Sequence, residues 1–325
     1  MNENGYDNRE DAEITVSVVI PICNEEESLA ALSERLLAVL EGSGETWEVI
    51  FVNDGSTDGS ADIIRGLHQR DPRFKSVAFS RNFGHQVAIS CGLDYARGRA
   101  VIAMDGDLQD PPEVLPDLLA RWRDGYEVVY AVRQERKENI FKRTAYKGFY
   151  WLMKKISYLD IPLDSGDFSL MDRKIVDLLR AMPERNRFVR GLRSWVGFRQ
   201  TGYEYERSAR FAGTSKYNFA RLMRLAFDGL VSYSFVPLRL VSNIGLLVSV
   251  SALVFMAYII VVRLAGDKII EGWTSTVVIV LFLGGIQLLA LGIIGEYMGR
   301  VFEEVKGRPR YVVGEVLGLP RDPSG

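Results

Sequence analysis

The sequence has few residues of the kinds that mark disulfide-rich, zinc-binding or nucleic-acid-binding proteins. Only two cysteines and two histidines occur among 325 residues, and Cys23 and Cys91 form no C-x-x-C or zinc-type spacing. We expect both to be buried free thiols in a reduced compartment. The 40 Lys and Arg nearly balance the 42 Asp and Glu, so no overall positive charge indicates a nucleic-acid partner.

Two common nucleotide-binding motifs are also absent. The chain contains no G-x-x-x-x-G-K-[ST] segment, and none of its predicted strands is followed by G-x-G-x-x-G. A nucleotide would therefore have to be held by side chains. The first residues are polar and acidic and lack the pattern of a signal peptide, so we expect residues 1–13 to form a disordered tail.

The carboxy-terminal third contains two long runs without charge. Residues 240–262 and 274–295 contain no charged side chain over 23 and 22 positions, and a helix of that length crosses a hydrocarbon core of about 30 Å. Lys and Arg are abundant before the first run and after the second. The positive-inside rule then predicts two transmembrane helices with both chain ends in the cytoplasm. A buried helical hairpin is the alternative.

The region between the tail and these runs has the pattern of an α/β domain. Five Val- and Ile-rich segments are predicted as strands, and amphipathic segments predicted as helices separate them. The strands are apolar along their whole length, which is typical of a parallel sheet covered on both faces. The sequence thus predicts a Rossmann-like, mostly parallel sheet with strands at 15–21, 47–54, 74–80, 99–105 and 127–132.

Polar residues follow the first four predicted strands. The stretch AMDGDLQDPPE, 103–113, places Asp105, Asp107 and Asp110 within six positions directly after the fourth strand. In such sheets, ligands bind beyond the carboxyl ends of the strands. We therefore expect a binding site at this edge rather than an ordinary polar turn, with contributions from 23–25, 54–56, 82–84 and 105–109.

The acidic stretch has the chemistry of a site for a hard cation. Two carboxylates at i and i+2 can converge on Mg²⁺ or Mn²⁺ and leave positions open for substrate phosphates. Asp105 and Asp107 are the predicted ligands, and Gln109 is a third through its amide oxygen. Asp54 is predicted to accept a hydrogen bond from a nucleotide base, with a turn or helix cap as the alternative. No role is predicted for His68 or His85.

Several motifs in sequence order resemble a known family. The segments VVIPICNEEESL, FVNDGSTDGS, SRNFGHQVAISCGLDYARG and MDGDLQDPPEVL resemble the GT-A glycosyltransferases of family 2. The later segments SGDFSLMDR, RFVRGLRSWVGFRQ, RFAGTSKY and GIIGEYMGRVFEEVKGRPRY are similar to polyprenyl-phosphate glycosyltransferases, relatives of dolichol-phosphate mannose synthase. The similarity covers residues 15–317 and is greatest to the two-span enzymes that make undecaprenyl-phosphate glucose.

The resemblance implies roles for individual residues. It implies a nucleotide-sugar site at Pro21, Asn24, Glu25, Asp54, Ser56 and Asp105. The implied metal ligands are Asp105, Asp107 and Gln109, and the implied catalytic residues are Asp107 and Asp167, the latter near the sugar. The implied lipid-phosphate site contains Arg133, Arg143, Arg210, Ser215 and Lys216. The Q-x-x-R-W motif of processive synthases is missing before the apolar runs, which favours a single transfer.

Two mixed basic and aromatic segments suit the membrane surface. Residues 140–157 and 216–235 combine aromatic with Lys and Arg side chains, as in helices that lie among lipid headgroups; a solvated surface helix is the alternative. The predicted organisation is a catalytic domain at 14–210, an interfacial segment at 211–236, two transmembrane helices within 237–298 and a cytoplasmic C-terminal tail at 299–325. Glycines in the second apolar run permit close helix packing and a homo-oligomer.

The predicted reaction is inverting, metal-dependent transfer of one hexose from a sugar nucleotide to undecaprenyl phosphate at the inner face of the cell membrane. UDP-glucose is the first choice of donor, and UDP-GlcNAc, GDP-mannose and a UDP-formamido-arabinose are alternatives. A nucleotidyltransferase would need a Gly-rich loop after the first strand, where the chain reads ICNEEES. An inactive sugar-nucleotide-binding membrane scaffold is the alternative from another functional class.

Overall fold

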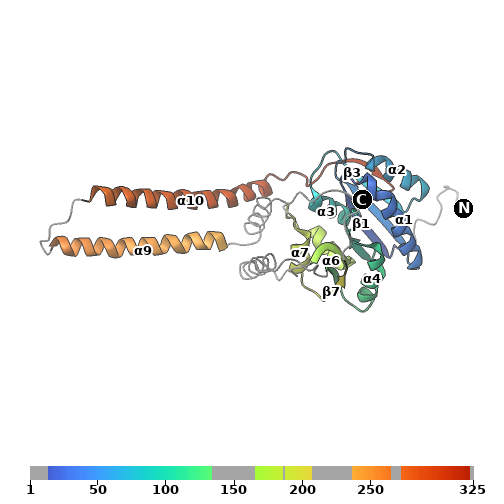
Figure 1. Ribbon diagram of the computed structural model, residues 1–325, viewed down its shortest axis with the longest axis horizontal. Helices are drawn as coiled ribbons and strands as arrows, with labels where there is room; N and C mark the ends of the chain where they lie inside the picture. Colours follow the sequence, from blue (N-terminus) through green and yellow to red (C-terminus); the bar gives the residue numbers. More distant parts are fainter. Residues whose placement is uncertain (1–13, 134–164, 186, 207–235, 265–271, 323–325) are drawn as a thin grey trace. The chain divides into compact units, whose positions relative to one another are not determined.

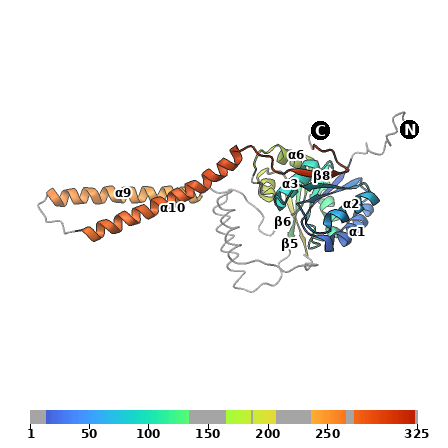
Figure 2. The same cartoon turned by 90° about the horizontal axis from the view of Figure 1, so that it is seen from above.

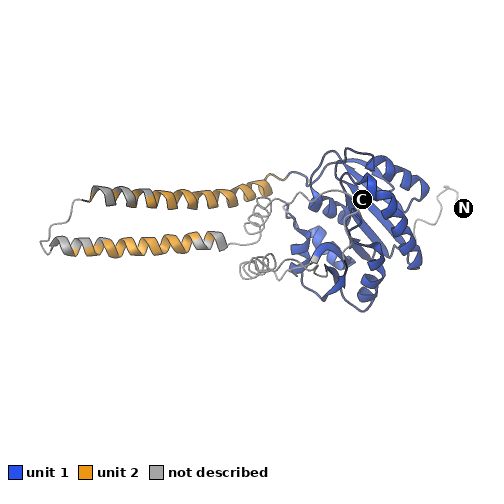
Figure 3. Cartoon of the chain, viewed as in Figure 1, with its two compact units in different colours: residues 1–150, 159–216, 308–325 blue, residues 151–158, 217–307 orange. Residues whose placement is uncertain are grey.

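A computed structural model gives the fold of the chain. It describes residues 14–133, 165–185, 187–206, 236–264 and 272–322. These residues divide into two compact units (Figure 3). The first contains 1–150, 159–216 and 308–325, and the second contains 151–158 and 217–307.

The first unit is built on a sheet of eight strands among the described residues (Figure 1). Its order is β7-β5-β6-β4-β1-β2-β3-β8. The strands are β1 (Val16–Ile22), β2 (Trp47–Asn53), β3 (Phe74–Phe79), β4 (Ala100–Ala103), β5 (Val128–Arg133), β6 (Ser165–Asp172), β7 (Gln200–Tyr205) and β8 (Val313–Leu317). The five strands predicted from the sequence are confirmed as β1 to β5.

Most of the pairs in this sheet are parallel. The run β4-β1-β2-β3 is parallel throughout, and β5 is parallel to β7. Strand β6, which the sequence did not predict, separates β4 from β5 and is antiparallel to both. Because β6 runs opposite to β4, its first residues lie at the carboxyl edge of β4. The sheet is therefore mostly parallel but not a continuous series of the predicted strands.

Helices cover both faces of the sheet. Along β1 the side chains alternate, so that Val18 and Ile20 pack in one core cluster and Val19 packs in the other. The first cluster includes apolar residues of α1 (Glu26–Gly42), α2 (Ser60–Arg70) and α4 (Leu115–Arg123), the last preceded by the short η1 (Pro112–Val114). The second includes those of α3 (His85–Tyr95), α6 (Arg173–Ala181) and α7 (Val189–Trp195). The apolar strands follow from this double cover.

The carboxy-terminal segment belongs to the sheet. Residues 299–325 were predicted to be a tail, but β8 pairs antiparallel with β3 at the edge of the sheet (Figure 2). Tyr311 stacks on Phe79, with 5.1 Å between the ring centroids. Its hydroxyl donates a hydrogen bond to Asp94 Oδ2 over 3.1 Å. After α10 (Trp273–Val305) the chain therefore contributes a strand to the sheet of the first unit.

The second unit contains two long helices. They are α9 (Val236–Leu264) and α10 (Trp273–Val305), and each includes one of the two uncharged runs. Among the described residues, Phe282–Val305 alone is long and apolar enough to cross a membrane, and Val241–Phe255 is a shorter apolar stretch. The prediction of two spans is thus not confirmed. The predicted interfacial segments at 140–157 and 211–235 lie outside the described residues.

Candidate active site

A cavity of about 290 Å³ lies at the carboxyl edge of the parallel strands. The segments that follow β1, β2, β3 and β4 all contribute to its lining. Its lining residues are Pro21, Ile22, Cys23, Glu25, Asp54, Asn82, Gly84, His85, Asp105, Gly106 and Asp107. The structure thus brings together five of the residues singled out in the sequence, Pro21, Glu25, Asp54, Asp105 and Asp107. Cys23 is an exposed free thiol, so the expectation that it is buried was wrong, whereas Cys91 is buried and free.

Asp54 connects the segments that follow β2 and β3. Its Oδ1 accepts the backbone N–H of Phe83 over 2.6 Å, and its Oδ2 accepts that of Gly84 over 2.9 Å. The next residue, Gly55, has φ +67°, and a Cβ there would lie 2.6 Å from the backbone nitrogen of Asn82. Asp54 therefore anchors a loop, as in the turn alternative, while also lining the cavity.

Asn24 and Ser56 connect the segments that follow β1 and β2. Asn24, with φ 58°, donates its backbone N–H to Ser56 Oγ over 3.1 Å. Its Oδ1 accepts the backbone N–H of Thr57 over 2.8 Å. Neither residue is part of the cavity lining. In the structure both residues shape the loop that follows β1 and carries Glu25.

Asp105 is held in a surplus of negative charge. Its Oδ1 is buried and has no hydrogen-bond partner. Burial, together with the charges of Asp110, Asp167 and Asp107, raises the pKa of Asp105 to about 6 in spite of the nearby His85. A buried oxygen without a donor among several carboxylates is the environment that a divalent cation stabilises. These residues therefore fit the predicted metal.

The predicted ligand set is only partly assembled. Asp107 lines the cavity beside Asp105, and its Oδ1 accepts the backbone N–H of Gln109 over 3.1 Å. Gln109 itself is not among the lining residues. Within the described ranges, no group of three or more His, Cys, Asp or Glu side chains has a metal-binding arrangement. Metal binding by Asp105 and Asp107, like that by Gln109, therefore stays a prediction.

Asp167 lies near the start of β6 and receives hydrogen bonds from two helices. Gln86 Nε2 of α3 donates to its Oδ2 over 2.9 Å, and Arg190 Nε of α7 donates to its Oδ1 over 3.4 Å. His85 Nε2 lies 3.4 Å from Oδ2. Burial alone would raise the pKa of Asp167, but His85 and Arg190 outweigh it and hold the pKa well below its usual range. The carboxylate is therefore ionised and firmly oriented.

His85 is a site residue that the sequence interpretation missed. It is the first residue of α3, lines the cavity, and is 47% exposed at its side chain. Burial would lower its pKa, but the hydrogen bond to Asp167 and the charges of Asp105 and Asp167 outweigh that effect and raise it. Its position directly after the third strand, in the segment NFGHQ, was the available signal.

Arg133 lies in a second group of polar side chains, next to Asp105 and Asp110. It hydrogen-bonds to Tyr205 and is attracted by Asp110 and Asp105, which together raise its pKa despite burial. The Tyr205 hydroxyl in turn donates to Asp110 Oδ1, and Asp110 is completely buried. The other residues predicted to bind the lipid phosphate, Arg143, Arg210, Ser215 and Lys216, lie outside the described residues.

Comparison with known proteins gives consistent results for sequence and fold. An uncharacterized glycosyltransferase of Bacillus subtilis, YkcC, is 47% identical over 307 residues, which cover 94% of this chain and 95% of that protein. A bactoprenol glucosyl transferase from a Shigella flexneri prophage is 41% identical over 299 residues, covering 92% and 97%. A mannosyltransferase of Pyrobaculum calidifontis, solved with GDP-Man and Mn²⁺, has a TM-score of 0.50 at 16% identity, covering 90% and 85%; this supports the fold alone.

The family assignment follows from the full-length relatives and from a direct match. The family model described as glycosyl transferase family 2 matches residues 17–179, which include β1 to β4, the cavity and Asp167. The α/β domain is GT-A-like, with a mostly parallel sheet. The chain belongs to glycosyl transferase family 2.

Proposed function

We propose that the protein transfers a single hexose from a sugar nucleotide to a polyprenyl phosphate at the membrane. UDP-glucose is the proposed donor and undecaprenyl phosphate the proposed acceptor. The observation that carries the proposal is the similarity, over nearly the whole of both chains, to proteins named bactoprenol glucosyl transferase. The cavity, which is lined by Pro21 and Asp54 and by the carboxylates of Asp105 and Asp107, supports a sugar-nucleotide site.

The acceptor chemistry is consistent with the groups around Asp167. A phosphate monoester has a second pKa of about 6, so it is mostly dianionic at neutral pH. Such a nucleophile needs no strong general base. Asp167 is ionised and receives hydrogen bonds from Gln86 and Arg190, which makes it a weak base. We assign it an orienting role towards the sugar or the acceptor. Attack opposite the leaving nucleoside diphosphate inverts the anomeric carbon.

A divalent cation, Mg²⁺ or Mn²⁺, would be held by Asp105 and Asp107, with Gln109 as the proposed third ligand. When bound, it would supply positive charge to the departing diphosphate. The protein's own contribution is to hold two carboxylates at one end of the cavity, where the raised pKa of Asp105 reflects unbalanced negative charge.

The proposed setting is the inner face of the cell membrane. The apolar helix segment Phe282–Val305 supports membrane attachment, and the positive-inside pattern supports cytoplasmic chain ends. A second span at 240–262, surface contact by residues 140–157 and 211–236, and a homo-oligomer through the membrane complete the proposal. Arg143, Arg210, Ser215 and Lys216 would join Arg133 around the lipid phosphate.

The test is transfer from radiolabelled UDP- and GDP-sugars to undecaprenyl phosphate by the full chain in detergent, with Mg²⁺, with Mn²⁺ and with EDTA. We expect one donor, UDP-glucose, to label the lipid in a metal-dependent reaction. If UDP-GlcNAc, GDP-mannose or a UDP-formamido-arabinose labels the lipid instead, the proposed donor is wrong but the proposed reaction, sugar transfer to a polyprenyl phosphate, still holds. Folded protein that binds sugar nucleotide tightly but labels no lipid with any donor would favour the scaffold function.

A further inference from the structure

We infer that His85 contacts the transferred sugar and makes the cavity distinguish a nucleoside diphosphate-sugar from the bare nucleoside diphosphate. The inference rests on the proposed function, because it takes the cavity to be the donor site. It goes further by assigning the hexose to one place, between Asp105 and Asp167, and by giving the imidazole Nε2–H the role of hydrogen-bond donor to a sugar oxygen.

The position of the imidazole supports this role. His85 Nε2 lies 3.5 Å from Asp105 Oδ1 and 3.4 Å from Asp167 Oδ2. The hydrogen bond to Asp167 is long, and 47% of the side chain is exposed. The Nε2–H is thus directed between two carboxylates and remains accessible from the cavity that His85 lines.

The backbone fixes this position. Gly84 donates its N–H to Asp54 Oδ2 over 2.9 Å, which holds the residue just before His85. Helix α3 then lies against the sheet so closely that a Cβ at Gly92 would come 2.0 Å from Val19 Cγ1. The backbone that carries the imidazole is therefore held in place without substrate. Such a preset donor loses little entropy when a ligand binds.

The order of groups along the cavity indicates which part of the donor reaches His85. Pro21 and Asp54 line it near the first two strands, and Asp105 and Asp107 line it after β4. If the two aspartates hold the diphosphate through a cation, the group attached to that diphosphate continues towards Asp167. His85 lies on this line. Carboxylate acceptors beside an imidazole donor suit hydroxyl groups, each of which both donates and accepts.

The neighbouring Gln86 separates this role from a purely structural one. Gln86 also contacts Asp167, but its Oε1 accepts the backbone N–H of Val189 over 2.9 Å, and it is absent from the cavity lining. Gln86 therefore connects α3 to α7 and orients Asp167. His85 instead contacts Asp105, which follows β4, and Asp167 of β6, and it lines the cavity.

The experiment compares dissociation constants for UDP and for the UDP-sugar that the transfer assay identifies. Calorimetric titration uses the full chain in detergent with saturating Mn²⁺. In His85→Ala we expect UDP to bind within about twofold of wild type. We expect the UDP-sugar to bind about tenfold more weakly, the loss typical of one hydrogen bond. His85→Gln places an amide N–H near the position of Nε2 and should recover most of the loss.

The control is His68→Ala, which removes the other histidine. His68 Nδ1 contacts the backbone oxygen of Phe74, the first residue of β3. His68 does not line the cavity. We expect both ligands to bind it as they bind wild type. Melting temperatures of all variants are recorded, and His85→Gln carries the test should His85→Ala fail to fold.

The outcomes are distinct. Equal weakening of UDP and the UDP-sugar in the His85 variants would mean that His85 only supports the acidic cluster, and would overturn the inference. Unchanged binding of both ligands would overturn it as well. Wild-type protein that binds no sugar nucleotide would instead overturn the proposed function, and the inference with it.

Discussion

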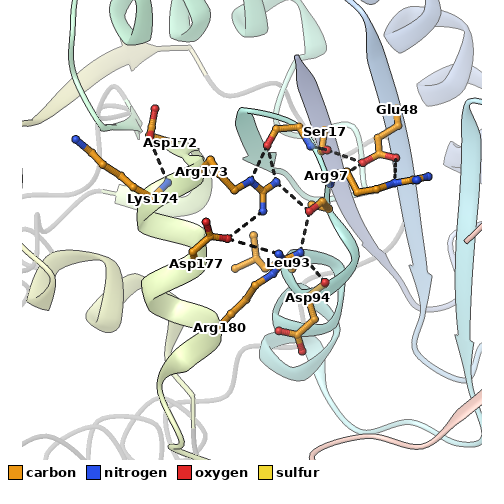
Figure 4. Close-up of polar contacts among 12 residues, drawn as sticks. Ser17, Glu48, Leu93, Asp94, Arg97, Asp172, Arg173, Lys174, Asp177 and Arg180 are labelled. Carbon is orange, nitrogen blue, oxygen red and sulfur yellow. Dashed lines mark hydrogen bonds and ion pairs between the residues drawn. The ribbon is translucent and has the colours of Figure 1, made fainter. Parts of the chain in front are cut away.

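The two edges of the parallel sheet are both rich in charge, but their charges are arranged differently. At the amino edge, Glu48, Arg173 and Arg180 pair with other side chains and with backbone groups (Figure 4). The buried Glu48 carboxylate accepts hydrogen bonds from Ser17 Oγ at 2.7 Å and from the Arg97 backbone N–H at 2.8 Å. It also accepts one from Lys75 Nζ at 2.7 Å. Arg173 and Arg180 donate to carbonyl oxygens at the end of α3 and just beyond it.

At the carboxyl edge, the Asp105 carboxylate lies in an excess of negative charge. Asp105, Asp107, Asp110 and Asp167 lie near one another, and Asp105 Oδ1 has no hydrogen-bond partner. Buried charge by itself therefore does not identify a binding site. Charged groups that are hydrogen-bonded and ion-paired within the protein stabilise the fold, whereas a cluster with uncompensated negative charge can bind a cationic ligand.

The largest effect is expected at Asp107, which lines the cavity. Asp107→Asn removes a proposed metal oxygen, and transfer should fall about a thousandfold or more because charge on the leaving group loses its stabilisation. The melting temperature should stay close to that of wild type. The measurement is lipid labelling at saturating donor, and near-normal labelling would show that the carboxyl edge holds no catalytic metal.

The variant Glu48→Gln tests whether the paired charges at the amino edge stabilise the fold. The substitution leaves Lys75 Nζ, which is 11% exposed, without its counter-ion at 2.7 Å. Loss of one partner of a buried pair costs about 3–5 kcal/mol of stability. Thermal unfolding of the full chain in detergent should report a clear drop in melting temperature. Transfer per folded molecule should be unchanged; a selective loss of transfer with unaltered melting would erase the contrast between the edges.

Asp167→Asn should lower turnover by about a hundredfold while it changes donor affinity little. The carboxylate is held by Gln86 and Arg190, and a neutral amide loses the charge while it keeps the shape. The orienting role predicts the loss in kcat. Steady-state kinetics with both substrates would measure it, and near-normal turnover would exclude the assigned role.

Tyr311→Phe should produce the smallest effect. It removes the hydroxyl that donates to Asp94 Oδ2 and keeps the ring that stacks on Phe79. One hydrogen bond contributes about 1 kcal/mol, so the melting temperature should fall slightly. Tyr311→Ala loses the stacking as well and should fall further. Equal melting of all three proteins would mean that the carboxy-terminal segment adds nothing to the catalytic domain.

The sequence predicts the part of the fold that depends on local pattern. Strands β1 to β5 and the helices between them follow from apolar periodicity, and the acidic stretch follows from its place after β4. The place of β5 in the sheet was not predicted, because β6, an antiparallel strand from beyond residue 164, inserts between β4 and β5. Such a pairing is set by tertiary contacts that no local pattern contains.

In the site, too, some residues can be predicted from local sequence, and others are recognised only from tertiary contacts. Asp105 and Asp107 are recognisable by spacing, whereas His85 acquires meaning only from the 3.4 and 3.5 Å contacts that β6 and β4 provide. A histidine at the start of a helix is usually structural when seen in sequence. Strand β8 was likewise invisible, since five residues at the end of the chain give no signal until β3 offers an open edge.

Unbalanced negative charge at the carboxyl edge of the sheet is tested most directly by the variant Asp105→Asn. Two quantities are measured for it and for wild type: the melting temperature in EDTA, and hexose transfer to the lipid. The pKa of Asp105 is raised to about 6 in the folded protein, whereas an unfolded Asp has a pKa of about 4. The folded protein therefore loses stability as the pH rises from about 4 to about 6, and this stability is not regained at higher pH. The account predicts that the variant melts higher than wild type at pH 7, with the difference vanishing near pH 4, and that it transfers no hexose. A variant that melts lower at pH 7 and still transfers would contradict the account.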